Sequence, residues 1–244
     1  MKIAVVSRIY NEECIIAEFL NHYREITTGG FYFYDDGSTD NTLSVLKSNT
    51  NVKHIIEGER HSTIASHTNQ NKQRQQILQV ALDNLDENDY ILLLDADEFI
   101  YFNSDAFDGK YDIGKCPLFD LYITKNDLQS HWTERKYVGP EVRDIIFMVR
   151  VGSYKTLLHD RTIVPIPNSI SKFIGFVKHV GKGISVEYWE RKCNHYANSN
   201  MPEKYSKKWN NRKGKAIHEM SDFNRTLYKW DYIIENKQKW IKID

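Results

Sequence analysis

The stretch YILLLDADEF, residues 90–99, carries the pattern that decides the fold of this 244-residue chain. Its first five residues form an apolar run, as expected for a strand covered on both faces. Two aspartates separated by one residue follow directly, so four carboxylate oxygens lie at the end of a buried strand. Mg²⁺ and Mn²⁺ prefer oxygen ligands and neutralise diphosphates. An isolated D-x-D is more simply an acidic turn, but its position after a buried strand favours a metal site.

The residues before this stretch alternate between strand-like and helix-like patterns. The predicted order is strand 3–6, helix 13–26, strand 31–34, a helix through 43–46, strand 52–56, helix 72–85 and strand 90–94. This order predicts an α/β fold, with a mostly parallel central sheet flanked by helices on both faces. Ligands of such sheets bind at the carboxyl ends of the strands.

Polar residues gather at three of these carboxyl ends, in 7–12, 35–40 and 95–98. The second cluster, Asp35-Asp36-Gly37-Ser38-Thr39-Asp40, is in part turn and helix-cap chemistry. Two adjacent carboxylates exceed what a cap requires, and a carboxylate there can accept the N–H of a base or the hydroxyls of a ribose. Arg74, on the helix before strand 90–94, can reach a nucleotide phosphate or base, although an arginine taken alone is more often a solvated helix residue.

Composition excludes several classes of protein. Lys and Arg (33) balance Asp and Glu (33), which argues against a dedicated nucleic-acid binder. Cys14, Cys116 and Cys193 are too scattered for a disulfide framework or a zinc cluster. No P-loop, dinucleotide fingerprint, nucleophile elbow or H-E-x-x-H motif occurs. We expect a cytoplasmic protein, because the sequence shows neither a signal peptide nor a run of 18 apolar residues.

Beyond residue 100 the periodicity weakens. Strands are predicted at 145–151 and 162–166, and another at 173–180. From Met201 onward the chain is basic and aromatic and is expected to be helical. This tail either rests on an anionic membrane or a lipid-linked acceptor, or packs its aromatic side chains on the domain. His195, with lysines downstream, can supply a metal ligand and hold departing phosphates, although a lone histidine is more often structural.

Together these residues resemble the glycosyltransferases of the GT-A fold, in particular inverting family 2 and its relatives with a D-x-D-E-F motif. The similarity rests on Asn11-Glu12-Glu13, on D-D-G-S-T-D at 35–40, on Arg74-Gln75, where the family has R-N, and on D-A-D-E-F at 95–99. His195-Tyr196, followed by Ser199 and Lys207, resembles a later segment of these relatives. The match covers about residues 2–100 closely and 195–208 in part.

The resemblance implies a single domain over 1–244: a nucleotide-sugar half at 1–100, an acceptor half at 101–200 and a helical tail at 201–244. It implies Mn²⁺ or Mg²⁺, with Asp97 as principal ligand and Asp95 and His195 as further ligands. The implied donor-binding residues are Arg8, Tyr10, Glu12, Asp35, Asp36, Arg74, Asp95, Ala96 and Lys207. Asp36 or Asp35 would hold the base, and a UDP-sugar is favoured, with dTDP and GDP open.

The reaction implied is a single displacement with inversion, in which a carboxylate takes the proton of a glycan or glycolipid hydroxyl. Glu141 and Asp144 are the leading candidates for this base, and Asp127 and Asp160 are the alternatives. Each of the four can also be an ordinary structural carboxylate. A sugar nucleotidyltransferase is the second enzyme class, but residues 8–11 lack its glycine-rich loop. A third interpretation is a binding domain without turnover.

Overall fold

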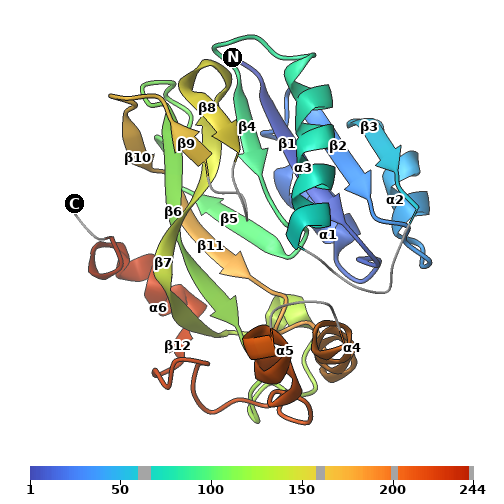
Figure 1. Ribbon diagram of the computed structural model, residues 1–244. Coiled ribbons are helices and arrows are strands. Elements are labelled where there is room, and N and C mark those ends of the chain that lie inside the picture. The colour runs from blue at the N-terminus through green and yellow to red at the C-terminus, as the bar shows by residue number, and fades with distance from the viewer. Residues whose placement is uncertain (60–66, 158–162, 199–202, 242–244) are drawn as a thin grey trace. The chain divides into compact units, whose positions relative to one another are not determined.

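The computed structural model describes residues 1–59, 67–157, 163–198 and 203–241 (Figure 1). These residues form two compact units. Unit 1 comprises residues 1–97, 104–115 and 146–172, and unit 2 comprises 98–103, 116–145 and 173–244. Strand β7 (Tyr137–Arg150) and strand β6 (Ile113–Leu121) each contribute residues to both units.

Unit 1 is built on a mixed sheet whose N-terminal strands are parallel. Its strands are β1 (Ile3–Ile9), β2 (Gly30–Asp35), β3 (Val52–Glu57) and β4 (Tyr90–Leu93), arranged in the order β3-β2-β1-β4. The pairs β2–β3, β1–β2 and β1–β4 are all parallel, and the last residues of β7 pair with β4 in the antiparallel direction. The predicted α/β class, with parallel strands at the start of the chain, is confirmed.

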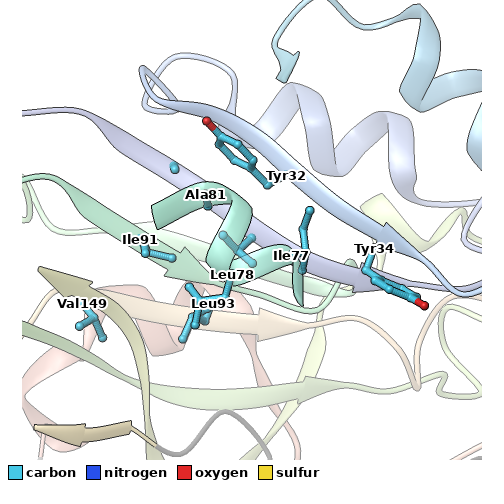
Figure 2. Close-up of a cluster of buried hydrophobic side chains, with 10 residues drawn as sticks. Tyr32, Tyr34, Ile77, Leu78, Ala81, Ile91, Leu93 and Val149 are labelled. Atoms are coloured by element: carbon cyan, nitrogen blue, oxygen red, sulfur yellow. The ribbon is translucent and has the colours of Figure 1, made fainter. Parts of the chain in front are cut away.

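Helices cover both faces of this sheet. The side chains of β2 alternate between the two faces, and each set packs on a different helix. Phe31 and Phe33 lie 6.4 Å, centroid to centroid, from Phe19 of helix α1 (Ile16–Tyr23). Tyr32 and Tyr34 instead belong to a buried cluster with α3 (His67–Leu82), shown in Figure 2. The other labelled members of that cluster are Ile77, Leu78, Ala81, Ile91, Leu93 and Val149. Helix α2 (Thr42–Ser48) connects β2 to β3.

The two longer helices of unit 1 depart from the predicted bounds. Helix α1 begins at Ile16 rather than near residue 13, because a turn in which the carbonyl of Glu12 accepts from the N–H groups of residues 15 and 16 comes first. Helix α3 begins at His67, five residues before the predicted start, and ends at Leu82. A hairpin, β8 (Tyr154–Leu157) with β9 (Ile163–Pro165), completes this unit.

Unit 2 combines a sheet with short helices. Strand β11 (Gly175–His179) pairs antiparallel with β5 (Glu98–Phe102) and parallel with β6, and β12 (Tyr228–Lys229) pairs antiparallel with β7. The helices are α4 (Val186–Ala197), α5 (Glu203–Asn210) and α6 (Trp230–Glu235). Helices α4 and α5 pack on each other around Trp189, Cys193 and Trp209.

Several elements of the second half differ from the prediction. The predicted strand 145–151 is the end of the longer β7, and the one at 162–166 is the short β9, with residue 162 outside the described residues. The segment 173–180 contains the end of β10 (Ser171–Phe173) and then β11. Strand β6 and helix α4 were not predicted. The tail is only partly helical, since turns and bridges separate α5 from α6 and from the 3₁₀ turn Lys237–Lys239.

The aromatic side chains of the tail pack inside unit 2. Trp209 and Trp230 are buried, and the ring of Trp240 lies 5.4 Å from that of Phe119 and 5.2 Å from that of Tyr228. This packing favours the second of the two interpretations of the tail. Among the described residues, no helix is both long enough and apolar enough to cross a membrane.

Candidate functional site

The carboxyl ends of β1, β2 and β4 meet at one edge of the unit 1 sheet. In the order β3-β2-β1-β4, the chain adds strands to one side of β1 and then moves to its other side with β4. Ligands of open α/β sheets bind at the carboxyl ends beside such a switch point. The polar segments 7–12 and 35–40 begin in the last residues of β1 and β2, and 95–97 comes after β4, so all three lie at the carboxyl ends of these strands.

Asp36 lies in a closed set of hydrogen bonds with Arg8 of β1 and Gln73 of α3. The guanidinium of Arg8 donates from Nη2 to Asp36 Oδ2 and from Nε to Gln73 Oε1, the latter at 2.6 Å. Gln73 Nε2 donates to Asp36 Oδ1 at 2.5 Å, so both carboxylate oxygens are engaged. All three groups are at least partly buried, which strengthens these bonds. The arrangement fixes the direction of Arg8 at the sheet edge.

The next residue of α3 reaches the other acidic segment. Arg74 Nη2 donates to Asp95 Oδ1 at 3.1 Å, and the side chain of Asp95 remains 34 % exposed. Ala96 and Asp97 are buried at 3 % and 5 % exposure. Consecutive residues of α3, Gln73 and Arg74, therefore connect the acidic segment after β2 to the acidic segment after β4. The sequence indicated Arg74 but not Gln73.

Asp35 has a structural role in the turn after β2. It is 2 % exposed, and its carboxylate accepts from the backbone N–H of Ser38 at 3.0 Å and from the Ser38 hydroxyl. Burial raises the pKa of this carboxyl above its ordinary value, with Asp36 and Glu57 acting in the same direction against the bonds from Ser38. Of the two aspartates, Asp36 is the one whose oxygens lie beside the side chains of the neighbouring strand and helix.

The loops after β1 and β2 are hydrogen-bonded to each other through the same residues that carry the family resemblance. Asn11 Oδ1 accepts from the N–H of Thr39 at 2.8 Å, and the N–H of Asn11 donates to Ser38 Oγ at 2.9 Å. The N–H of Glu12 donates to Thr42 Oγ1 at 2.8 Å, and Glu13 Oε2 accepts from both nitrogens of Asn41 at 3.1 Å. These motifs therefore shape the loops beside Tyr10 as well as supplying candidate ligands.

Replacing Asn11 is expected to loosen this pair of loops. Its backbone adopts φ 52°, a conformation in which Asn is tolerated and Ala is strained. Asn11→Ala loses the side-chain bond and adds strain, so we expect it to lower the free energy of unfolding by about 1–3 kcal/mol. Asn11→Gly loses the bond without the strain and should cost less. Urea unfolding of both variants checks this, and equal losses would contradict the strain.

The remaining predicted donor and metal residues lie in unit 2. His195 is in the last turn of α4, with its ring 5.0 Å from that of Tyr196. Lys207 is an exposed residue of α5 whose Nζ lies 2.6 Å from Glu203 Oε1, one helical turn earlier. Their roles in binding a donor or a metal stay predictions.

The candidate bases fall in different settings. Glu141 is a partly exposed residue of β7, whereas the side chain of Asp144 and the whole of Asp160 lie outside the described residues. Asp127 is buried and accepts from the N–H and the hydroxyl of Thr124, both at 2.8 Å. Arg135 Nη1 lies 3.7 Å from the same oxygen. Asp127 is thus held within a turn, and the assignment of Glu141 or Asp144 as the base stays a prediction.

Asp95 and Asp97 offer the carboxylate oxygens that Mg²⁺ and Mn²⁺ prefer. Within the described ranges, no group of three or more His, Cys, Asp or Glu side chains is gathered closely enough to hold a metal ion. Mg²⁺ is commonly held by one or two carboxylates, with water and substrate phosphates as its other ligands. The two aspartates fit such an ion in number and chemistry, and a metal here stays a prediction.

A buried ionic network in unit 2 was not predicted. Lys182 Nζ donates to Asp222 Oδ2 at 2.7 Å and to Asp120 Oδ2, and Asp120 Oδ1 lies 2.6 Å from His179 Nδ1. Arg212 Nη2 also donates to Asp222. Asp120 is 1 % exposed and Lys182 is 7 % exposed. The signal available in the sequence was Asp120 itself, an isolated acid inside the run PLFDLY, because a buried carboxylate requires a cationic partner.

No protein-family model matches the chain, and no curated protein sequence matches it. Among solved structures, the chain is similar to residues 1–349 of S. aureus TarS, with 17% identity and a TM-score of 0.37 over 86% of this chain and 69% of that one. A second structure of S. aureus TarS gives 18% identity and a TM-score of 0.37, over 86% of this chain and 42% of that chain. HddC from Yersinia pseudotuberculosis gives 9% identity and a TM-score of 0.33, over 74% and 90%.

Proposed function

We propose that this chain is a glycosyltransferase that moves a sugar from a nucleotide-sugar to an acceptor hydroxyl. The observation that carries the proposal is the pairing of two acidic segments by helix α3. Gln73 bonds to Asp36 after β2, and the adjacent Arg74 bonds to Asp95 after β4. These segments lie beside the switch point of the unit 1 sheet, where α/β proteins bind nucleotides.

The donor half of the reaction is assigned to residues of unit 1. Asp36, oriented by Arg8, accepts the N–H of the base or a ribose hydroxyl, and a UDP-sugar is favoured. Arg74 lies beside the exposed carboxylate of Asp95, where its guanidinium can also meet a phosphate oxygen. Tyr10 and Glu12, in the loop after β1, and Ala96, between the two aspartates, are the other proposed donor-binding residues of this unit. Asp95 and Asp97 would hold Mn²⁺ or Mg²⁺, which neutralises charge on the leaving diphosphate when bound.

The acceptor half is assigned to β7. As the acceptor oxygen attacks the anomeric carbon, its proton passes to a carboxylate, for which Glu141 and Asp144 are proposed. The bond from the anomeric carbon to the diphosphate oxygen breaks in the same displacement, so the configuration inverts. His195 and Lys207 are proposed to assist the metal and the departing phosphates. The acceptor is proposed to be a glycan or a lipid-linked sugar.

The proposal is tested by donor binding. We would measure thermal stabilisation and calorimetric affinity for UDP-, dTDP- and GDP-sugars, with and without Mn²⁺. A donor present at 100 times its Kd stabilises the folded chain by about 2.7 kcal/mol. We expect one donor to bind in a metal-dependent manner, and Asp97→Ala to abolish that binding.

The matched control is Asp83→Ala, which removes an exposed aspartate of unit 1 whose carboxylate accepts from Gln79 Nε2 at 2.8 Å, one helical turn earlier. This variant should bind the donor as wild type does. Binding of a nucleotide-sugar without transfer or slow hydrolysis would point to a binding domain. Failure of all donors to bind in the presence of metal would overturn the transferase.

A further inference from the structure

We propose that a basic pocket of unit 2, formed by α5 and the segment after it, binds the phosphate or diphosphate group of a small molecule or glycan. The pocket has a volume of about 1010 Å³ and is lined mainly by residues 203–224. It lies within unit 2 and contains none of the predicted metal ligands (α5 in Figure 1). Its lining includes Lys207, a predicted donor-binding residue, so the proposal rests on the proposed function only where the bound group is the nucleotide diphosphate; phosphate binding itself does not require sugar transfer.

The cations of this pocket outnumber its anions. Its basic lining residues are Lys204, Lys207, Lys208, Arg212 and Lys215, and its acidic ones are Glu203, Glu219 and Asp222. The chain as a whole carries equal numbers of basic and acidic residues, so this surplus is local. A concave surface lined by one sign of charge focuses the field and attracts the opposite charge.

Each acidic residue of the pocket already has a cationic partner. Glu203 Oε1 lies 2.6 Å from Lys207 Nζ, and Glu219 Oε1 lies 2.6 Å from Nζ of Lys125, outside the lining. Asp222 is held by Arg212 and by the buried Lys182. The acidic groups therefore leave part of the positive charge of the pocket unneutralised.

Three of the lysines carry this remaining charge. No ion pair joins Lys204, Lys208 or Lys215 to any residue in the described part of the chain, and all three line the same pocket. The pKa of Lys208 is lowered by burial and by the positive charges of Arg212 and Lys182. A lowered pKa means that the surroundings of this lysine disfavour its protonated, positively charged form. An anion bound beside Lys208 would relieve that cost.

The ligand class follows from the geometry of the donors. Lysine ammonium groups are compact point charges, and several of them around one cavity suit a multiply charged phosphate better than a single carboxylate. The volume exceeds that of one phosphate group, so the phosphate is expected to be part of a larger molecule. It is either the diphosphate of a nucleotide or a phosphate carried by a second ligand.

The probe is inorganic pyrophosphate, titrated calorimetrically into the full chain in the presence of a chelator. We expect millimolar or tighter binding that weakens as ionic strength rises. Substituting Lys204, Lys208 and Lys215 together by Gln should weaken it about tenfold or more. The control substitutes Lys47, Lys53 and Lys110, exposed lysines of unit 1, by Gln; it makes the same change in net charge and should leave affinity unaltered.

A variant that is expected to tighten binding separates an effect on the pocket from damage to the fold. Glu203→Gln frees Lys207 from its partner, so pyrophosphate should bind about two- to fivefold more tightly. Damage to the fold cannot produce that tightening. Absent pyrophosphate binding, or equal losses in the two triple variants, would overturn the proposal. The Asp97→Ala variant should bind pyrophosphate like wild type, which keeps this result distinct from the donor-binding test.

A competition arm identifies the source of the phosphate. If UDP displaces pyrophosphate from wild type, and binds more weakly to the triple pocket variant, the pocket receives the nucleotide diphosphate. If UDP and pyrophosphate bind together, the pocket serves a second, phosphate-bearing ligand. Both results support a phosphate site and differ only in the molecule that carries the group.

Discussion

Replacing Lys182 by methionine is expected to lower the free energy of unfolding by about 3–5 kcal/mol. The ammonium group of Lys182 lies between Asp120 and Asp222 in unit 2. Asp222 would keep Arg212 as a partner, but Asp120, 1 % exposed on β6, would keep only His179 among the residues that the structure describes. An uncompensated buried carboxylate is far more costly than the loss of an exposed ion pair. Urea unfolding followed by tryptophan fluorescence measures the loss.

Two further variants test the cause. Lys125→Met removes an exposed lysine whose Nζ lies 2.6 Å from Glu219 Oε1, and no measurable change is expected, because water replaces the partner. The double substitution Lys182→Met with Asp120→Asn also removes the uncompensated negative charge of Asp120 and should recover part of the lost stability. If the double variant were less stable than Lys182→Met alone, the buried charge would not be the cause.

The pH dependence of stability should reverse its sign in Lys182→Met. In the wild type, burial acts to raise the pKa of Asp120, but Lys182 and His179 outweigh it and hold that pKa below the ordinary range. Stability from this group is therefore present above the unfolded pKa near 3.9, and is lost as the pH falls below it. Without Lys182, burial favours the neutral form of Asp120 and raises its pKa, so acid relieves the cost by protonating this carboxyl. The variant should then gain stability between about pH 7 and 5.

The first half of the fold could be predicted because its information is local. Apolar runs, glycines and helical spacing over 3–94 give the order of the elements, and that order restricts the sheet to few topologies. The acidic segments then fall at one edge. The partners of these carboxylates could not be predicted as readily, since Gln73 and Asp36 are 37 residues apart and meet only because α3 packs on β1 and β2.

The second half was predicted less well, and only for β6 is the reason physical. Strand β6 contains Lys115 and Asp120, so its sequence does not alternate cleanly; Asp120 is neutralised by Lys182, which lies 62 residues later. Helix α4 does carry a usable signal: Tyr188, Trp189 and Cys193 are buried at helical spacing, and Ser185 caps the first turn by accepting from the N–H of Tyr188 at 3.0 Å. Helix α4 could therefore have been predicted from the periodicity of its sequence alone.

Trp189→Ala is expected to cost about 3–5 kcal/mol of unfolding free energy, the range for truncating a large core aromatic residue. Trp189 is fully buried on α4, with its ring centroid 6.1 Å from that of Trp209 and 5.2 Å from that of His218. Its Nε1 donates to the backbone carbonyl of Arg212 at 3.1 Å. The substitution therefore leaves a cavity and removes the donor to that carbonyl. A loss below about 1 kcal/mol would contradict this.

Trp189→Phe separates the cavity from the hydrogen bond. Phenylalanine fills most of the space, so the expected loss is about 1–2 kcal/mol, mainly from the lost Nε1 hydrogen bond, since the Arg212 carbonyl still accepts from the N–H of Lys215 at 3.1 Å. Arg212 and His218 both line the basic pocket and both contact Trp189. Pyrophosphate affinity of folded Trp189→Phe should therefore fall, although the charge of the pocket is unchanged. Unaltered affinity would show that the lysines of α5 hold the phosphate without help from the Arg212 segment, and that the core beneath the pocket serves stability alone.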